Sequence, residues 1–161
     1  MTDTLIIFVA EYLFVALPLI AGIWWIRLNP DVRKKVFILG VIAAPLSFIA
    51  TRVASKLYFD PRPFVAEHTT PLISHSADNG FPSDHTALCA LIAWIVFTQN
   101  RKLGLVLLAL TIIVGAGRVA ARVHSPTDIL GSITITAVVV FAVNWLITFI
   151  LHKRTVQGGK A

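Results

Sequence analysis

Charge is scarce in this chain: 14% of its 161 residues are charged, 57% are hydrophobic, and the mean hydropathy is +0.80. A typical soluble domain carries about 25% charged residues, so we expect this chain to lie in a lipid bilayer. Its length has room for several spanning helices of about 20 residues each and leaves little for a second domain. We therefore predict a single integral membrane domain over residues 1–161.

Cysteine is almost absent, since Cys89 stands alone in the sequence. A lone cysteine excludes an intrachain disulfide and argues against a cysteine-based metal cluster. The net charge of +6 is dispersed between apolar segments rather than gathered in a basic arm, so nucleic acid is not an expected partner. Glu67, His68, His75 and Asp78 lack clear metal-ligand spacing, and we interpret them as a solvated loop. We expect no metal and no cofactor.

Five apolar segments predict the helices of an all-α, polytopic membrane bundle with about five transmembrane helices. They are Leu5–Ile26, Val36–Tyr58, Thr86–Thr98, Leu103–Ala121 and Ile129–Leu151. The third is short for a full span. Between Asp60 and Ser83, four prolines and a glycine argue against a continuous helix, so we expect a loop that folds over the outer surface.

The basic residues predict the orientation in the membrane. Nine of them flank two short turns and the C-terminal tail, which should therefore be cytoplasmic: Arg27, Arg33, Lys34, Lys35, Arg101, Lys102, Lys153, Arg154 and Lys160. The long loop and the Arg122–Asp128 turn then lie on the extracytoplasmic side. The other five basic residues fall near this outer face, against the positive-inside bias, which favours a functional reason: Arg52, Lys56, Arg62, Arg118 and Arg122.

Two polar clusters at this face suit an anion. Lys56 and Arg62 offer an ammonium and a guanidinium that together can neutralise a phosphate dianion, although snorkelling to lipid headgroups is the alternative interpretation. Ser83 can cap the third helix and leave backbone N–H groups at its positive end. Simple capping, with His85 as an interfacial histidine, is the alternative there.

The third cluster contains Arg118, His124 and Asp128. Arg118 can bind another phosphate oxygen. His124 precedes Asp128 by four residues, and a carboxylate there can accept a hydrogen bond from one imidazole nitrogen and leave the other free to attack phosphorus. Ser125, Pro126 and Asp128 also form a good helix start by themselves, and the two interpretations are compatible.

Together these residues resemble the three-part signature of the type-2 phosphatidic acid phosphatase superfamily. The matching positions are Lys56 with Arg62 and Pro63, then Pro82, Ser83, Asp84 and His85, then Arg118, His124 and Asp128. The resemblance is greatest to bacterial undecaprenyl-diphosphate phosphatases of the bacitracin-resistance type. Five residues separate Lys56 from Arg62 where the family pattern usually has six, and Asp84 and Gly117 stand where it usually has glycine and serine.

The resemblance implies a role for each matching residue. His124 would be the nucleophile, Asp128 its orienting partner and His85 the acid that protonates the leaving oxygen, while Lys56, Arg62, Ser83 and Arg118 would hold the phosphoryl oxygens. It implies a metal-independent enzyme of the bacterial plasma membrane, with its site facing the periplasm or cell exterior. This enzyme would hydrolyse undecaprenyl diphosphate through a phosphohistidine and so recycle the lipid carrier of cell-wall synthesis.

Other substrates and functions remain open at this point. Phosphatidylglycerol phosphate, phosphatidic acid and transfer of the phosphoryl group to another lipid would use the same residues. A phospholipid or polyprenyl-phosphate transporter is less favoured, because binding an anion needs cations but not the histidines His85 and His124. Arg52 and Arg122 are candidates for holding a second phosphate, and Glu11 is a candidate for the site or an exposed carboxylate. The oligomeric state is not predicted.

Overall fold

The computed structural model describes residues 2–158, which form helices and no strand. The elements are α1 (Thr2–Glu11), the short 3-10 helix η1 (Leu13–Val15), α2 (Ala16–Ile26), α3 (Pro30–Leu57), α4 (Pro63–Ala66), α5 (Asp84–Phe97), α6 (Arg101–Ala120) and α7 (Pro126–Gly158). The prediction of an all-α bundle is confirmed. Lys160 lies outside the described residues.

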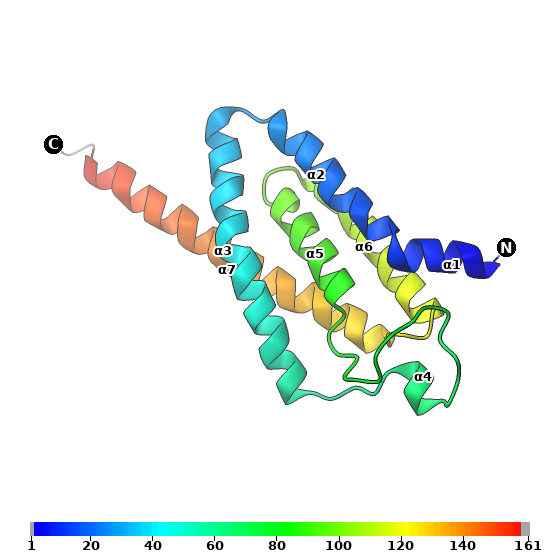
Figure 1. Cartoon of the computed structure of the whole chain (residues 1–161). Coiled ribbons are helices and arrows are strands. Elements are labelled where there is room, and N and C mark those ends of the chain that lie inside the picture. Colours follow the sequence, from blue (N-terminus) through cyan, green and yellow to red (C-terminus); the bar gives the residue numbers. More distant parts are fainter. Residues whose placement is uncertain (1, 159–161) are drawn as a thin grey trace.

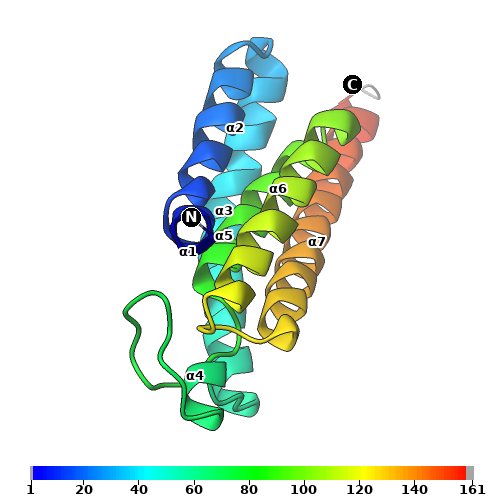
Figure 2. The same cartoon turned by 90° about the vertical axis from the view of Figure 1, so that its right-hand side faces the viewer.

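Helix α5 is the centre of the bundle, with α2, α3, α6 and α7 packed around it (Figures 1 and 2). Its central position agrees with its side chains, since small and apolar residues such as Cys89, Ala90 and Ala93 are buried completely. Trp94 adds a polar link by donating a hydrogen bond from Nε1 to the carbonyl oxygen of Ile133 in α7, over 3.1 Å. The other helices are thereby held around a common core.

Capping residues explain where three of the helices begin. The side chains of Asn29, Ser83 and Asn100 accept hydrogen bonds from backbone N–H groups in the first turns of α3, α5 and α6. Pro30 follows Asn29 at the first helical position, where a proline costs nothing. Helix α3 therefore begins six residues before the apolar segment that starts at Val36.

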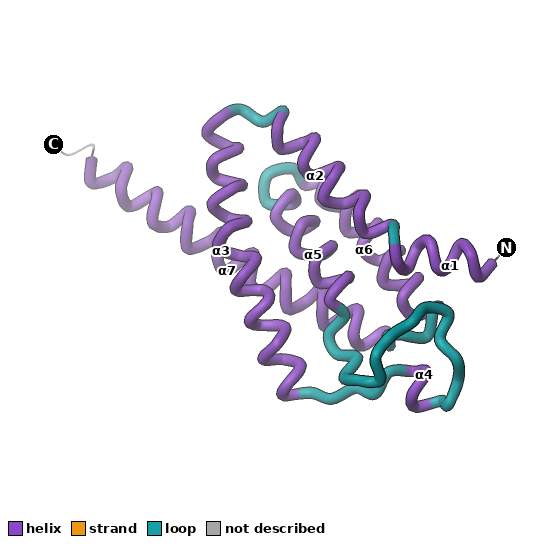
Figure 3. The backbone as a smooth tube through the Cα atoms, in the orientation of Figure 1, coloured by secondary structure: helices purple, strands orange, loops and turns teal. Residues whose placement is uncertain are grey.

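The connections gather at the two ends of the bundle. The long segment between α3 and α5, including α4, lies at the same end as the α6–α7 turn, whereas the α2–α3 and α5–α6 turns lie at the opposite end (Figures 1 and 3). Polar residues from three distant stretches of sequence consequently share one end. The two short turns predicted to be cytoplasmic share the other end, together with the far end of α7 (Figure 2).

Three helices, α3, α6 and α7, are long and apolar enough to cross a membrane. The N-terminal segment supplies a fourth candidate span, but the continuous helix predicted over Leu5–Ile26 is wrong, because a break near Tyr12 bends it by 40°. Pro18 gives a physical reason, since its ring has no N–H to donate to the carbonyl of Phe14 and clashes with that turn. Helix α5, with 14 residues, is shorter than α3, α6 and α7, as its short apolar segment predicts.

Large apolar side chains cover the outward faces of the long helices. Phe48 of α3, Ile112 of α6 and Val138 of α7 are each more than half exposed. Such an extensive apolar surface is unfavourable in water and suits contact with lipid chains. The faces that point inward instead carry buried residues such as Leu39, Leu107 and Val140.

Candidate active site

A polar cavity of about 160 Å³ lies at the end of the bundle that holds the long α3–α5 segment. Four of the residues predicted from the sequence line its wall: Arg62, His85, Arg118 and His124. They come from the start of α4, the start of α5, the last turn of α6 and the α6–α7 turn. The fold thus brings all three sequence clusters to one place.

His124 is held by Asp128 in a buried pair. The two side chains are 3% and 1% exposed, and Nδ1 of His124 lies 3.0 Å from Oδ2 of Asp128. The same oxygen accepts from the backbone N–H of Ser125 at 2.9 Å, while Ser125 Oγ accepts from the backbone N–H of Asp128 at 3.3 Å. Asp128 therefore orients the imidazole and stabilises the start of α7 at once. Because an ionised carboxylate only accepts, Nδ1 carries the proton and Nε2 keeps its lone pair.

Arg62 lies beside the free nitrogen of His124. Its Nη1 is 3.4 Å from His124 Nε2 and donates to the carbonyl oxygen of Val123 at 2.7 Å. Its Nε donates to Asp78 at 2.8 Å and its Nη2 to the carbonyl oxygen of Asn79 at 3.3 Å. With 5% of its surface exposed, the guanidinium is fixed in position with its positive charge next to the imidazole.

The electrostatics of the cavity keep its loop histidines neutral. Burial lowers the pKa of His124 below its usual 6.5, nearby Arg62 and Arg118 lower it further, and the Asp128 hydrogen bond only partly opposes them. Burial and the same two arginines lower the pKa of His75. A neutral imidazole with a free Nε2 is the form that can act as a nucleophile.

Arg118 and His85 also line the cavity. Arg118 is 3% exposed, and its Nη1 donates to the carbonyl oxygen of Ala10 at 3.4 Å, while its buried Nε has no hydrogen-bond partner among the described residues. His85 packs edge-to-face on Phe14, with ring centroids 4.9 Å apart. A buried cation with an unused donor is suited to an anion that enters the cavity.

Two of the predicted phosphate ligands do not line the cavity. Lys56 is exposed and is not part of the cavity wall, which instead contains Ser55. Ser55 is the position separated from Arg62 by the six residues of the usual family pattern, and consecutive helical residues point about 100° apart. Ser83 is buried and uses its hydroxyl within α5, where it accepts from the backbone N–H of Thr86 at 3.4 Å. That contact fits the capping interpretation.

The wall also contains His75, which the sequence did not single out, and Arg52, which the sequence offered as a candidate for a second phosphate. His75 is half-buried, its ring lies 5.9 Å from that of His124, and its Nδ1 has no partner in the described part of the chain. The interpretation of His75 as a solvated loop residue is therefore wrong, although His68 is exposed. No spacing signal distinguishes these two histidines. Arg52 does carry a signal, because it precedes Ser55 by three residues and so shares its helix face.

The two remaining candidates are not on this wall. Arg122 is exposed and adopts a left-handed backbone with φ of 64°, at the turn after α6. Glu11 is half-buried at the end of α1, near Arg118 but outside the cavity. Of the two arginines considered for a second phosphate, Arg52 is the one placed to serve it.

Comparison with known proteins identifies the family. Residues 34–151 match the PAP2 superfamily. Undecaprenyl-diphosphatase BcrC of Bacillus subtilis (strain 168) is 36% identical over 142 residues, which cover 86% of this chain and 72% of that protein. Bacitracin transport permease protein BcrC of Bacillus licheniformis is 33% identical over 130 residues, covering 80% of this chain and 64% of that protein. The chain belongs to the PAP2 superfamily and is a membrane phosphatase of that family.

The fold agrees with this assignment. The crystal structure of a transmembrane PAP2-type phosphatidylglycerolphosphate phosphatase from Bacillus subtilis superimposes with a TM-score of 0.57 at 20% identity, covering 92% of this chain and 76% of that one. Together with three long apolar helices and a bent fourth candidate, this likeness defines a multi-pass membrane protein.

Proposed function

We propose that this protein hydrolyses undecaprenyl diphosphate to undecaprenyl phosphate and inorganic phosphate, and thereby recycles the lipid carrier of cell-wall synthesis. The observation that carries the proposal is the His124–Asp128 pair, whose free Nε2 opens beside Arg62 on the cavity wall. The choice of lipid is supported by 36% identity to a protein named undecaprenyl-diphosphatase.

In the first step, Nε2 of His124 attacks the terminal phosphorus and forms a P–N bond while the P–O bond to the bridging oxygen breaks. Undecaprenyl phosphate leaves and takes a proton from His85, which must be protonated for this step. Arg62 and Arg118 stabilise the charge on the phosphoryl oxygens, and Asp128 stabilises the imidazolium that develops on His124. Lys56 and Ser83 remain proposed phosphate ligands, which would require Lys56 to turn toward the cavity.

In the second step, water attacks the phosphohistidine, His85 takes a proton from that water, and the P–N bond breaks to release inorganic phosphate and restore His124. We propose that neither step needs a metal ion, because the two buried arginines supply the positive charge that a metal would otherwise provide. The enzyme should therefore keep its activity in the presence of a chelator.

We further propose that the cavity faces the periplasm or cell exterior, with the α2–α3 and α5–α6 turns in the cytoplasm. The basic residues at those turns support this orientation. Cys89 is completely buried, so a new cysteine can report on topology with little background. A membrane-impermeant maleimide should label Glu67→Cys but not Lys34→Cys in intact cells treated so that the reagent reaches the outer face of the plasma membrane. The reverse pattern would refute the orientation.

A substrate panel tests the proposed reaction. The purified detergent-solubilised protein is assayed in chelator for phosphate release from undecaprenyl diphosphate, phosphatidylglycerol phosphate and phosphatidic acid, with and without an acceptor lipid. We expect the highest kcat/KM for undecaprenyl diphosphate and no dependence on the acceptor. Preference for another lipid, or product that forms only with an acceptor, would overturn the assignment.

A further inference from the structure

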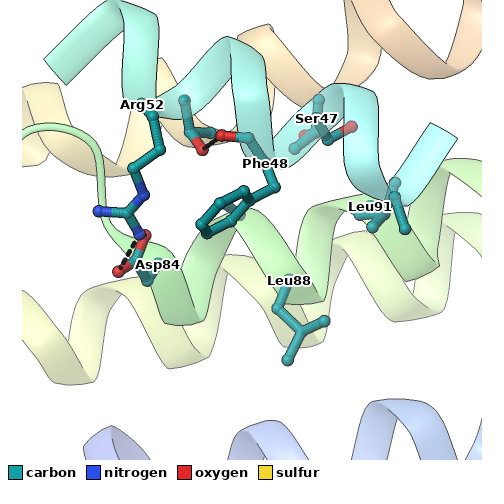
Figure 4. A pocket seen from close by; sticks show the side chains of 10 residues that line it. Ser47, Phe48, Arg52, Asp84, Leu88 and Leu91 are labelled. Atoms are coloured by element: carbon teal, nitrogen blue, oxygen red, sulfur yellow. Dashed lines mark hydrogen bonds and ion pairs between the residues drawn. The ribbon is translucent and has the colours of Figure 1, made fainter. Parts of the chain in front are cut away.

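A second cavity, of about 360 Å³, lies directly beside the polar one and extends between α3, α5 and α7. Its walls are largely apolar, with Phe48 of α3 and Leu88 and Leu91 of α5 (Figure 4). This volume is within the range of about 300–1,000 Å³ that is usual for small-ligand sites. We call this space the α3–α5 groove.

The groove and the polar cavity meet at Arg52 and Asp84, which belong to the walls of both. In Figure 4 these two residues are at one end of the groove, while Leu91 and Ser47 are toward the other. The groove therefore has a charged end that adjoins the polar cavity and an apolar remainder. A lipid phosphate has the same arrangement, with a charged headgroup followed by an apolar tail.

The charged end is closed by an ion pair that is easily opened. Nη2 of Arg52 lies 2.7 and 2.8 Å from the two oxygens of Asp84, and the side chains are 49% and 63% exposed. Exposed pairs of this kind contribute little to stability. The hydrogen bonds from Arg52 to Asp84 both come from Nη2, so the rest of the guanidinium can donate to another anion.

We propose that the α3–α5 groove holds the beginning of the lipid tail and that Arg52 binds the phosphate nearest to that tail. This inference rests on the proposed function. The terminal phosphate would lie in the polar cavity beside His124, the second phosphate at Arg52, and the first isoprene units along Phe48 and Leu88. Asp84 would hold Arg52 in place until the substrate competes for it, which gives a reason for a carboxylate at a position where glycine is usual in the family.

Arg52 is tested by comparing farnesyl diphosphate with farnesyl monophosphate, which share a tail and differ by the phosphate in question. Arg52→Ala should lower kcat/KM for the diphosphate by about tenfold or more, the effect of losing a hydrogen bond to a charged group, and change hydrolysis of the monophosphate little. Arg101→Ala, an exposed arginine at the opposite end of the bundle, is the matched control. Equal loss on both substrates, or loss on neither, would overturn the role of Arg52.

The groove is tested by filling it. Ala44 lines the groove near the middle of α3, and Ala44→Trp should obstruct it, whereas Ala109→Trp adds the same bulk to an exposed position on α6. Dimethylallyl, farnesyl and undecaprenyl diphosphates share a headgroup and differ in tail length. Ala44→Trp should reduce kcat/KM about tenfold or more for the two longer tails and spare the shortest.

The outcomes separate this inference from the proposed function. Absence of phosphate release by the wild-type protein from every lipid diphosphate would contradict the proposed function itself. Normal wild-type turnover combined with an Ala44→Trp variant that treats all tails alike would contradict the groove alone. Turnover of dimethylallyl diphosphate also shows that the variant is folded, so a loss confined to the longer tails supports the groove.

Discussion

Replacing Asp128 with asparagine tests how the buried pair activates His124. The carboxylate accepts from His124 Nδ1 at 3.0 Å and from the Ser125 backbone N–H at 2.9 Å, so an amide oxygen can keep the geometry while the negative charge is lost. When Nε2 attacks phosphorus, the imidazole ring becomes positive. The lost charge should therefore be felt in the transition state more than in substrate binding.

The structure sets the size of this effect. At 3.0 Å and an effective dielectric constant of about 20, the attraction between two unit charges is about 5 kcal/mol, which limits the loss to about four orders of magnitude in rate. The amide dipole and local water recover part of that energy. We expect Asp128→Asn to reduce kcat by about 100- to 1,000-fold, with KM little changed because Asp128 is not on the cavity wall.

The assay is phosphate release from undecaprenyl diphosphate at several substrate concentrations, with unfolding followed in parallel. Asp31→Asn, an exposed carboxylate at the start of α3 on the opposite end of the bundle, is the matched control and should keep wild-type kcat. A folded Asp128→Asn protein with kcat within threefold of wild type would refute the argument that this carboxylate supports the nucleophile.

Three further predictions concern the surroundings of the pair. Because the folded-state pKa of His124 is lowered from 6.5, kcat/KM should lose its dependence on this group above pH 6.5 and decline as pH falls through the lowered pKa. Below pH 6.5 the unfolded chain then binds more protons than the folded protein, so the free energy of unfolding from denaturant titrations should also fall as the pH drops. A free energy of unfolding that rises instead, with NMR tracing the effect to His124, would contradict this. Arg62→Lys keeps the charge but loses the planar fork that contacts Asp78 and Val123 together, and kcat/KM should fall about 100-fold; near-normal kinetics would show that charge alone suffices. Gly80→Ala would place a Cβ 2.8 Å from Asp128 Oδ2 and should lower both thermal stability and kcat, whereas Gly22→Ala, with nothing within 4 Å, should lower neither; wild-type behaviour of Gly80→Ala would show that the loop moves freely.

The convergence of His85, Arg118 and His124 could be predicted because each lies at the end of a helix. Short connections between successive spanning helices place alternate turns at opposite ends of the bundle, so the order of the apolar segments was sufficient to place these three residues at one end. The pairing of His124 with Asp128 followed from their spacing at a helix start. These features depend on local chemistry that is visible in sequence.

The contribution of the long loop could not be predicted in the same way. His75 and His68 are both loop histidines, yet His75 lies on the cavity wall and His68 is exposed. The difference arises from tertiary contacts, including the Arg62–Asp78 ion pair and the bond from Gly80 N–H to the Asp60 carbonyl that fold the loop back. Neither contact has a periodicity or spacing that the sequence would reveal.

The position of Lys56 illustrates the limit of motif matching. A lysine one residue from the usual spacing resembles the family motif, but a shift of one residue in a helix changes the direction of the side chain by about 100°. The structure places Ser55 and Arg52 toward the cavity and leaves Lys56 exposed. Helix geometry, applied to the position rather than to the residue type, favours Arg52, a sequence candidate for a second phosphate, over Lys56 on this face.

The most direct test of the account is to identify the atom that receives the phosphoryl group. Wild-type protein mixed with undecaprenyl diphosphate labelled in its terminal phosphate is denatured in alkali during turnover, where a phosphohistidine survives, and its peptides are analysed by mass spectrometry. We predict that the label lies on the peptide that contains His124. The His124→Ala variant should show neither label nor turnover. Label on another residue, or near-normal turnover by the folded His124→Ala protein, would contradict the account.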